Sequence, residues 1–508
     1  MSGARVLRKN HAILGVVVLA ITIADLSWSG GTGETSSQRL VRFPKRGSFG
    51  TLYVRDRGST VGLSPEIIPP EASPAALRYD GWEELGPARR SVAVPPGKDL
   101  LLYVKRRPPR FWYELLHFGG QEQDQGPLTD LSPLDSLRPD DIQGLWVLGA
   151  NLRDQDLRRL RRLSSLSELD LSSNRIGDAG MEHVAYLRNL RRLRLVFTRV
   201  GDGGLAHLRN LTALQDLQVV SQGAVTDVGM AAIADMKWLR RLCLSGSEVT
   251  DGGLANLKGC VALEELDLSG CNVKGWGLSS VGSSQSLRVL HLDSTRVADG
   301  SLGAVGKFKT LQRLKLDHTR IGDEHLYQLR SLASLQCLEL PYTAVTDAGM
   351  IHLRDLMHLC YLDLEGTHVS DEALSLLGGL TNLENLNLAC TKITGAGLIH
   401  LQGFASLRKV NLSNSSLTES GLSQLPALVS LRELYASRTQ TGDYGLRSLQ
   451  GLTRLEHLSL SDTNITDSAV LILGKISSLR TLSVARTRIT KTGLRKLQQA
   501  LPQCRISW

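Results

Sequence analysis

Carboxylate side chains recur at a fixed spacing along most of the chain, and a row of carboxylates is a ligand set that a divalent cation such as Ca²⁺ prefers. A structural interpretation competes with this one, because an aspartate that starts a helix can cap the free backbone N–H groups of the first turn. Each aspartate stands where an apolar helical pattern begins, so we expect helix capping rather than metal binding. The positions are Asp154, Asp178, Asp202, Asp227, Asp251, Asp299, Asp323, Asp347, Asp371, Asp443 and Asp467.

Threonine and glycine recur beside these aspartates. Thr319 and Thr343 stand four residues before an aspartate, and Gly349 stands two residues after one. Because turn amides need hydrogen-bond partners, we expect the threonine hydroxyls to bond loop backbone between neighbouring repeats. The glycines are expected to allow close packing where the helical segment meets the sheet. The recurring aspartates, threonines and glycines are therefore predicted to stabilise the repeat rather than to form a catalytic or metal site.

A different set of polar residues varies from repeat to repeat and is expected on the exposed face of neighbouring strands. Carboxylates predominate in this set, so the face could bind a basic segment of a protein partner. The alternative is a solvated face without a partner, and calcium binding is disfavoured because Arg313 and Lys315 interrupt the acids. The predicted partner-binding residues are Asp267, His291, Asp293, Arg313, Lys315, Asp317, Glu339, Tyr361, Asp363, Glu365 and Tyr435.

Motifs for catalysis or cofactor binding do not emerge. Residues 300–308 (GSLGAVGKF) approach a phosphate-binding loop, but Phe308 stands where a Ser or Thr must reach magnesium. The sequence holds neither HExxH nor GxSxG. Seven cysteines, all between Cys243 and Cys504, include no CxxC pair, which predicts mostly free thiols and no zinc site. We therefore expect no catalytic residues, no cofactor, no metal ion and no enzymatic activity.

The elements that must position these residues follow from a 24-residue repeat. Residues 311–334, LQRLKLDHTRIGDEHLYQLRSLAS, show one unit. Leu314 and Leu316 alternate as on a strand, and Leu326, Leu329 and Leu332 follow at the spacing of a short helix. Stacked units of this kind form a solenoid whose strands make one parallel sheet. About fifteen units fit between residues 142 and 500, with one 25-residue step near Gln222.

The ends of the array differ from the repeats. Arg5, Arg8 and Lys9 precede the apolar run 12–24, which predicts a secretory signal or an uncleaved anchor. The full expected division is 1–28 signal peptide or signal anchor, 29–38 flexible tether, 39–107 small β-rich domain, 108–141 linker and N-terminal cap, 142–500 solenoid, and 501–508 C-terminal cap strand. In the β-rich domain we expect a hairpin of residues 92–94 and 100–104.

The net charge of +9 is concentrated in one short segment. Residues 39–110 hold fourteen Lys/Arg and seven Asp/Glu, whereas the repeats are close to neutral. The repeats therefore lack the basic surplus that nucleic-acid binding needs. The basic segment is either a solvated linker or a contact with an acidic surface, such as a membrane or a cell-wall polymer.

The pattern LxxLxLxxTxIxDxGLxxLxxL, as in residues 190–208 and 335–353, resembles the leucine-rich repeats of the 24-residue GALA-like and cysteine-containing types. The preceding motifs RGSFGTLYVRD, WEELGPAR and VAVPPGKDLLLYV resemble the segment before such repeats in exported bacterial proteins of unassigned role. The resemblance implies an α/β solenoid in the form of a curved horseshoe, with a parallel inner sheet and short helices on the convex side. It also implies recognition of a protein partner.

Two functions are consistent with the sequence. The first is a non-catalytic protein-binding scaffold, exported (periplasmic, cell-surface or secreted) or anchored to the membrane. The second is an intracellular adaptor, such as an F-box-like substrate receptor of a ubiquitin ligase. No F-box-like helical segment precedes Ile142, and this favours the exported scaffold.

Overall fold

The computed structural model describes residues 39–42, 51–56, 83–87, 91–94, 98–105, 130–221, 224–281, 285–297, 302–425 and 428–508. The expected signal segment and tether, the expected linker up to residue 129, and the expected extra residue near Gln222 lie outside these ranges. The chain forms two compact units, Met1–Cys243 and Leu244–Trp508.

Unit 1 begins with a small group of strands: β1 (Arg39–Arg42), β2 (Thr51–Asp56), β3 (Glu83–Pro87), β4 (Ser91–Val94) and β5 (Lys98–Lys105). The expected hairpin of residues 92–94 and 100–104 is wrong. β4 pairs antiparallel with β1, and β5 pairs antiparallel with β2. β5 also pairs in parallel with the first repeat strand, β6 (Gly144–Leu148). β2, β3 and β5 therefore continue the repeat sheet, whereas β1 and β4 form a two-stranded sheet of their own.

The repeats of unit 1 follow one pattern. After η1 (Ser132–Ser136) come the strands β6, β7 (Glu168–Asp170), β8 (Arg192–Arg194), β9 (Asp216–Gln218) and β10 (Arg241–Cys243), each parallel to its neighbour. The helices between them are η2 (Asp154–Arg162), α3 (Asp178–Val184), α4 (Asp202–Leu208) and α5 (Asp227–Met230).

Unit 2 repeats the same coil. Its strands are β11 (Glu265–Asp267), β12 (Val289–His291), β13 (Arg313–Lys315), β14 (Cys337–Glu339), β15 (Tyr361–Asp363), β16 (Asn385–Asn387), β17 (Lys409–Asn411), β18 (Glu433–Tyr435), β19 (His457–Ser459), β20 (Thr481–Ser483) and β21 (Arg505–Ser507). Each pairs in parallel with the next, from β11 to β21, so the sheet is open at β21.

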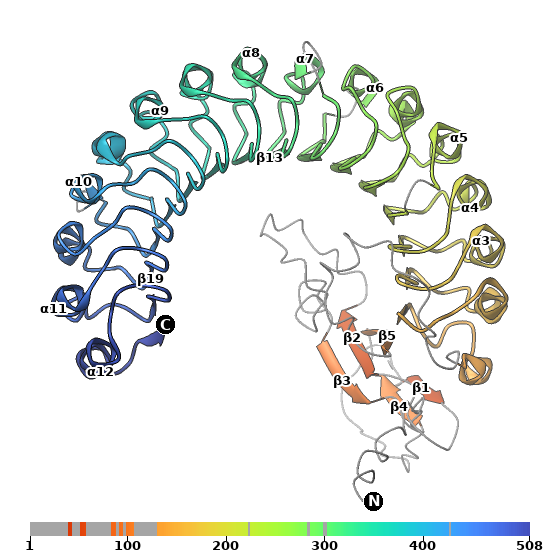
Figure 1. Ribbon diagram of the computed structural model, residues 1–508. Helices are drawn as coiled ribbons and strands as arrows, with labels where there is room; N and C mark the ends of the chain where they lie inside the picture. The colour runs from red at the N-terminus through yellow and green to blue at the C-terminus, as the bar shows by residue number, and fades with distance from the viewer. Residues whose placement is uncertain are drawn as a thin grey trace, which may run out of the picture. The chain divides into compact units, whose positions relative to one another are not determined.

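The helical segments of unit 2 are short. They are η3 (Gly253–Gly259), α6 (Leu278–Val281), α7 (Leu302–Val305), α8 (Asp323–Leu326), η4 (Tyr327–Leu329), η5 (Asp347–His352), α9 (Asp371–Leu376), η6 (Ala396–Leu401), α10 (Glu419–Leu422), η8 (Gly445–Gly451), η9 (Asp467–Ala469), α11 (Val470–Leu473) and α12 (Lys491–Ala500). Figure 1 shows the strands of unit 2 on the inner side of a curved ribbon and its helices on the outer side. This arrangement confirms the predicted α/β solenoid.

The core lies between the sheet and the helices. Leu314 and Leu316 of the strand side, and Leu326 and Leu329 of the helix side, are fully buried. The same positions are buried in the neighbouring coils, because the register Leu290↔Leu314↔Leu338 stacks equivalent leucines on one another. A single coil buries only part of its apolar surface, so each coil depends on its neighbours to bury the remaining apolar surface.

The aspartate column does not cap its own helices. The N-cap before α9 is Ser370, and Asp371 is the first helical residue. The Asp323 carboxylate accepts hydrogen bonds from the Thr346 backbone N–H (2.8 Å) and the Thr346 hydroxyl (2.6 Å), one coil further along. The predicted capping role is therefore wrong for this column: the carboxylate reaches the coil that follows, where unbonded turn amides need an acceptor.

The threonine hydroxyls bond within their own coil, whereas the prediction was that they bond between neighbouring coils. The Thr319 hydroxyl donates to the Leu316 carbonyl (2.6 Å), three residues earlier in the same coil, and Thr343 bonds Leu340 in the same way (2.7 Å). The glycine column also differs from expectation. A Cβ atom on Gly349 would lie 2.4 Å from Oδ1 of Asp323, so this glycine makes room for the aspartate of the preceding coil rather than for the sheet.

Candidate functional site

The predicted partner-binding residues lie on the inner face of unit 2, on strands β11 to β15 and the turns that follow them. One row runs in register across the sheet: Asp267, His291, Lys315, Glu339 and Asp363. The strand positions before this row hold Arg313 and Tyr361, and the turns after it hold Asp293, Asp317 and Glu365. We call these ten residues the acidic face. The structure brings all ten together, because parallel strands of equal length stack equivalent positions about 4.8 Å apart.

One predicted residue does not join them. Tyr435 lies in the same row, but on β18, three strands beyond β15. Its hydroxyl donates to Oε2 of Glu433 (3.0 Å), and the ammonium group of Lys409 lies 5.1 Å from its ring centre. Its contacts are therefore with its own strand and the strand before, and it is not part of the acidic face.

Several carboxylates of the acidic face have partners within it. The Lys315 ammonium lies 3.0 Å from Oε2 of Glu339. The Tyr361 hydroxyl donates to Oδ2 of Asp363 (3.2 Å). Asn387 of β16 donates to both Asp363 (3.1 Å) and Glu365 (3.1 Å). Glu339, Asp363 and Glu365 are thus held in place by neighbouring side chains.

Three polar atoms of the acidic face are buried and have no hydrogen-bond partner in the part of the chain that the structure describes. They are Oδ1 of Asp293, Oδ1 of Asp317 and Nε2 of His291. Asp293 keeps a contact through its other oxygen, which lies 3.1 Å from the Ser269 hydroxyl. Buried polar atoms without partners are uncommon and costly. These atoms mark the point where the acidic face is least satisfied by the described residues.

The pKa values reflect this arrangement. Burial raises the pKa of Asp317, and the negative charges of Asp293 and Glu339 raise it further, to about 7. Burial also raises the pKa of Asp293 and of Asp363. Burial and nearby negative charges both favour the protonated acid, so Asp317 is partly protonated near neutral pH.

Asp267 behaves in the opposite way. Burial alone would raise its pKa, but hydrogen bonding and charge from His291, together with the Ser269 hydroxyl at 2.6 Å, outweigh burial and lower it to about 2. Asp267 therefore stays ionised at the edge of the acidic face, whereas Asp317 near its centre titrates close to neutrality.

Three residues that shape this surface were not among the predicted site residues. Ser269, Tyr342 and Asn387 all bond its carboxylates; the Tyr342 hydroxyl donates to Oε1 of Glu365 at 2.9 Å. Tyr342 occupies a left-handed turn position (φ 54°) and stacks on His318, with ring centres 4.7 Å apart. Ser269 and Asn387 stand at the same repeat positions as the predicted acids, and this equivalence was the signal that could have found them.

The inner strands of unit 1 provide a contrast. There, acids and bases alternate from strand to strand and neutralise one another. Arg192 lies 2.7 Å from Glu168, Arg194 lies 4.0 Å from Asp170, and Arg241 lies 3.5 Å from Asp216. In the acidic face, Lys315 pairs with Glu339, and Nδ1 of His291 lies 3.8 Å from Oδ2 of Asp267. The excess of carboxylates is thus a property of one group of coils, not of the repeat.

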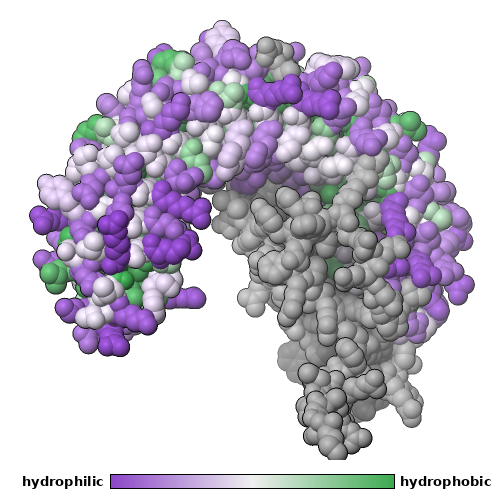
Figure 2. Space-filling view, viewed as in Figure 1, coloured by the Kyte–Doolittle hydropathy of each residue, from purple (hydrophilic) through white to green (hydrophobic). Residues whose placement is uncertain are grey.

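Among the described residues, no group of three or more His, Cys, Asp or Glu side chains has the arrangement of a metal site. Cys271, Cys337, Cys360, Cys390 and Cys504 are free thiols. Figure 2 shows hydrophobic side chains of unit 2 scattered singly over the visible face rather than gathered into a patch. In the described part of the chain, no helix is long and apolar enough to cross a membrane.

Comparisons with known proteins agree with the repeat geometry. The sequence profile of the family described as "Leucine Rich repeat" matches residues 162–185 and 260–282. Among curated protein sequences, none matches significantly. The predicted GALA-like or cysteine-containing subtype is not tested by this profile and stays a prediction.

Solved structures with a similar fold include other repeat proteins. An internalin from Listeria monocytogenes shares 19% identity, with 75% of this chain and 89% of that chain covered and a TM-score of 0.43. A leucine-rich-repeat protein from Leptospira interrogans shares 20% identity, with 72% and 84% covered and a TM-score of 0.48. The ectodomain of an Arabidopsis thaliana receptor kinase, solved in complex with Casparian strip integrity factor 2, shares 15% identity, with 70% and 57% covered and a TM-score of 0.41.

The family match falls on two of the 24-residue units, and the same coil of strand, turn and short helix recurs along both units of the structure. Stacked parallel strands, buried leucines in register and the two matched units all describe one architecture. The chain is a leucine-rich-repeat protein.

Proposed function

We propose that this protein is a binding scaffold whose acidic face takes a basic segment of a protein partner. Leucine-rich-repeat proteins generally act in protein–protein interaction rather than in catalysis. The observation that carries the proposal is the pair of buried carboxylate oxygens, on Asp293 and Asp317, that lack partners among the described residues. A guanidinium or ammonium group from a partner would supply the missing donors and the missing charge.

The surrounding residues favour a polypeptide rather than a simple cation. Tyr361 and Tyr342 place aromatic rings beside the carboxylates, and tyrosine is enriched where protein interfaces form. The acidic face spreads over five strands, which is about 19 Å from β11 to β15. A basic stretch of several residues covers that length, whereas a single ion does not.

A direct test uses a fluorescein-labelled peptide of alternating arginine and serine, and measures its binding to the full chain by fluorescence anisotropy. The double variant Asp293→Asn/Asp317→Asn removes both carboxylates with little change of shape. We expect it to weaken binding at least about tenfold, because a desolvated charge pair contributes several kcal/mol. Added salt should also weaken binding to the unaltered chain.

The matched control is Glu324→Gln/Glu372→Gln, which removes two negative charges from exposed helix positions on the outer side. This control should bind the peptide as the unaltered chain does. Equal affinities for the acidic-face variant and the control would show that the acidic face does not bind the peptide.

We further propose that the protein is exported or membrane-anchored, on the strength of Arg5, Arg8 and Lys9 before the apolar run 12–24. Cell fractionation and sequencing of the mature N-terminus test this proposal. Recovery in an exported or membrane fraction is expected. An intact Met1 on protein from the cytosolic fraction would contradict export and favour the intracellular adaptor.

A further inference from the structure

Two rows of arginines flank the inner strands of the last coils of unit 2. In the first row, Glu456 lies between Arg432 and Arg480, with its two oxygens 3.1 Å from a nitrogen of each arginine. The first row stands just before β18, β19 and β20. Each of its arginines is more than half exposed, while Glu456 is only 23% exposed. The carboxylate is thus enclosed, and the guanidinium groups remain open to solvent.

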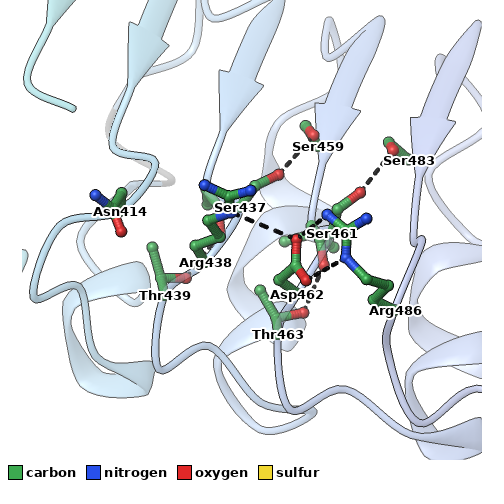
Figure 3. Close-up of polar contacts among 12 residues, drawn as sticks. Asn414, Ser437, Arg438, Thr439, Ser459, Ser461, Asp462, Thr463, Ser483 and Arg486 are labelled. Atoms are coloured by element: carbon green, nitrogen blue, oxygen red, sulfur yellow. Dashed lines mark hydrogen bonds and ion pairs between the residues drawn. The ribbon is translucent and has the colours of Figure 1, made fainter. Parts of the chain in front are cut away.

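The second row stands just after the same three strands. Asp462 lies between Arg438 and Arg486 (Figure 3). Arg486 donates to both oxygens of Asp462, at 2.5 and 2.6 Å, and Nε of Arg438 lies 3.6 Å from Oδ2. The arginines are 65% and 67% exposed, and Asp462 is 27% exposed. The second row therefore repeats the two-to-one ratio of the first.

The geometry of the second row depends on the backbone. Arg438, Asp462 and Arg486 all adopt left-handed conformations, with φ of 54°, 58° and 53°. Non-glycine residues rarely take this conformation. Here the turn is held by the next coil, because the Arg438 N–H donates to the Ser461 carbonyl and the Asp462 N–H donates to the Ala485 carbonyl, each at 2.9 Å. The arginines are held in line along one edge of the sheet.

Between the two rows, the side chains of the inner surface are small and mostly uncharged. Ser437 and Ser459 lie 2.7 Å apart, as do Ser461 and Ser483, and these pairs appear in Figure 3. His457 bonds the Thr481 hydroxyl at 2.6 Å. The acid Glu433 is paired with Lys409 at 3.3 Å. Hydroxyl groups that can donate or accept therefore fill the space between two rows of positive charge.

Acidic and basic residues are also segregated along the sequence of unit 2. Residues 244–400 hold twelve Lys/Arg and eighteen Asp/Glu, whereas residues 431–508 hold twelve Lys/Arg and five Asp/Glu. The acidic face belongs to the first part, and both arginine rows belong to the second. The two surfaces therefore select ligands of opposite charge.

We propose that the arginine rows and the hydroxyl surface between them form a second binding surface, which recognises an acidic polypeptide segment. Arginine matches carboxylates through two parallel N–H···O bonds, and the exposed guanidinium groups keep free N–H donors for a ligand. From Arg432 to Arg480 is about 10 Å, or two strand spacings. An extended peptide with an acid at every second position places carboxylates about 7 Å apart on one side, about 3 Å less than that distance, and the long arginine side chains can span the difference.

The same rows disfavour a nucleic-acid duplex. A duplex carries one phosphate per about 1.7 Å of its axis. Charge of that density would bring phosphates against Glu456 and Asp462, the acids at the middle of each row. In a peptide with spaced carboxylates, the carboxylates can pair with the outer arginines, and neutral residues can lie over Glu456 and Asp462.

The test measures binding of a fluorescein-labelled peptide of alternating aspartate and serine to the full chain, by fluorescence anisotropy at low salt. Arg438→Gln/Arg486→Gln should weaken binding about tenfold or more, as expected for the loss of close charge pairs. Arg432→Gln/Arg480→Gln, in the other row, should do the same. The matched control, Arg447→Gln/Arg495→Gln, removes two exposed arginines from η8 and α12 and should leave binding unchanged.

Three outcomes would overturn the proposal: no binding of the acidic peptide, equal binding by the row variants and the control, or tighter binding of single-stranded DNA of equal length. Thermal denaturation of each variant checks that it is folded. The Arg–Ser peptide separates this proposal from the proposed function. Its binding should respond to Asp293→Asn/Asp317→Asn and not to the row variants, whereas the acidic peptide should show the reverse response.

Discussion

At the scale of single residues, nine of the turn aspartates accept hydrogen bonds from the coil that follows them. Asp371 shows the fullest set, because its carboxylate accepts from the backbone N–H groups of Thr394 (3.0 Å), Gly395 (3.1 Å) and Gly397 (2.9 Å). These bonds, with one from the Thr394 hydroxyl (2.5 Å), outweigh the effect of burial and lower the pKa of Asp371. One carboxylate thus satisfies amides that the next helix cannot bond for itself.

A substitution at one such aspartate should lower stability through the coil that follows. We expect Asp323→Ala to reduce the free energy of unfolding by about 1–3 kcal/mol, since it leaves the Thr346 N–H without its acceptor. Urea denaturation followed by circular dichroism measures the change. Asp355→Ala, at an exposed position, is the control and should cost less than about 0.5 kcal/mol. A similar loss in both variants would argue against a role for Asp323 in joining coils.

Asp317 makes a prediction for pH. Its ordinary pKa of 3.8 is raised to about 7 in the folded chain, first by burial and then by Asp293 and Glu339. Lys315 opposes the rise, and Asp363 adds to it. Between pH 4 and 7 the folded chain holds a proton that the unfolded chain releases, so the contribution of Asp317 to stability falls as pH rises through this range.

Asp317→Asn, which is neutral at every pH, should therefore melt at a higher temperature than the unaltered chain at pH 8 and at the same temperature near pH 4. Thermal denaturation over this pH range measures the difference. Glu372→Gln provides a control of equal charge change on α9. A difference between Asp317→Asn and the unaltered chain that does not vary with pH would contradict the raised pKa.

At the scale of elements, the strands of unit 2 are only three residues long, yet their ladders continue into the turns. His318 and Tyr342 adopt left-handed conformations, and their N–H groups donate to the carbonyls of Pro341 (2.9 Å) and Glu365 (2.8 Å) in the next coil. The strain of a left-handed residue is offset by an inter-coil hydrogen bond at the same residue. The turns are thereby held in register with the strands.

The last strand makes a prediction at this scale. β21 pairs with β20, Ile506 is opposite Leu482, and Leu501 and Cys504 are buried against the last coil. Deleting residues 501–508 should destabilise the terminal coils by about 2–4 kcal/mol, since one or two large apolar side chains are lost from the core. Hydrogen exchange should show faster exchange in β19 and β20 with little change in β12 and β13. Uniform loss of protection would contradict nearest-neighbour stability.

At the scale of the whole molecule, acidic and basic residues are nearly equal in number in the repeats, but they are strongly segregated along unit 2. The near-neutral repeat array led to the expectation that the repeats lack a basic surplus. Within unit 2, however, the acidic face and the arginine rows lie on strands β11–β15 and around β18–β20, both on the inner side (Figure 1). Unit 1 shows acids and bases alternating between neighbouring strands instead. Net charge averaged over hundreds of residues does not report such patterns.

The sequence predicted the coil and most of the acidic face, because a 24-residue period assigns every residue a place on the strand, the turn or the helix. Ten of the eleven predicted site residues lie together for this reason. The period did not predict which contacts each side chain makes. Asp323 and Thr319 belong to one coil, yet one bonds the next coil and the other bonds its own. The period places each residue in the coil, but it does not give the coil to which the side chain bonds.

Period and burial were thus determined by the sequence itself, since leucines at fixed positions can be removed from water only in stacked coils. The tertiary structure decided what depends on neighbours across 24 residues. It set the direction of the aspartate and threonine bonds, the pairing of β5 with β6 rather than β4, and the enclosure of Glu456 and Asp462 between arginines. Distances and solvation fix these interactions, and both arise only when the coils stack.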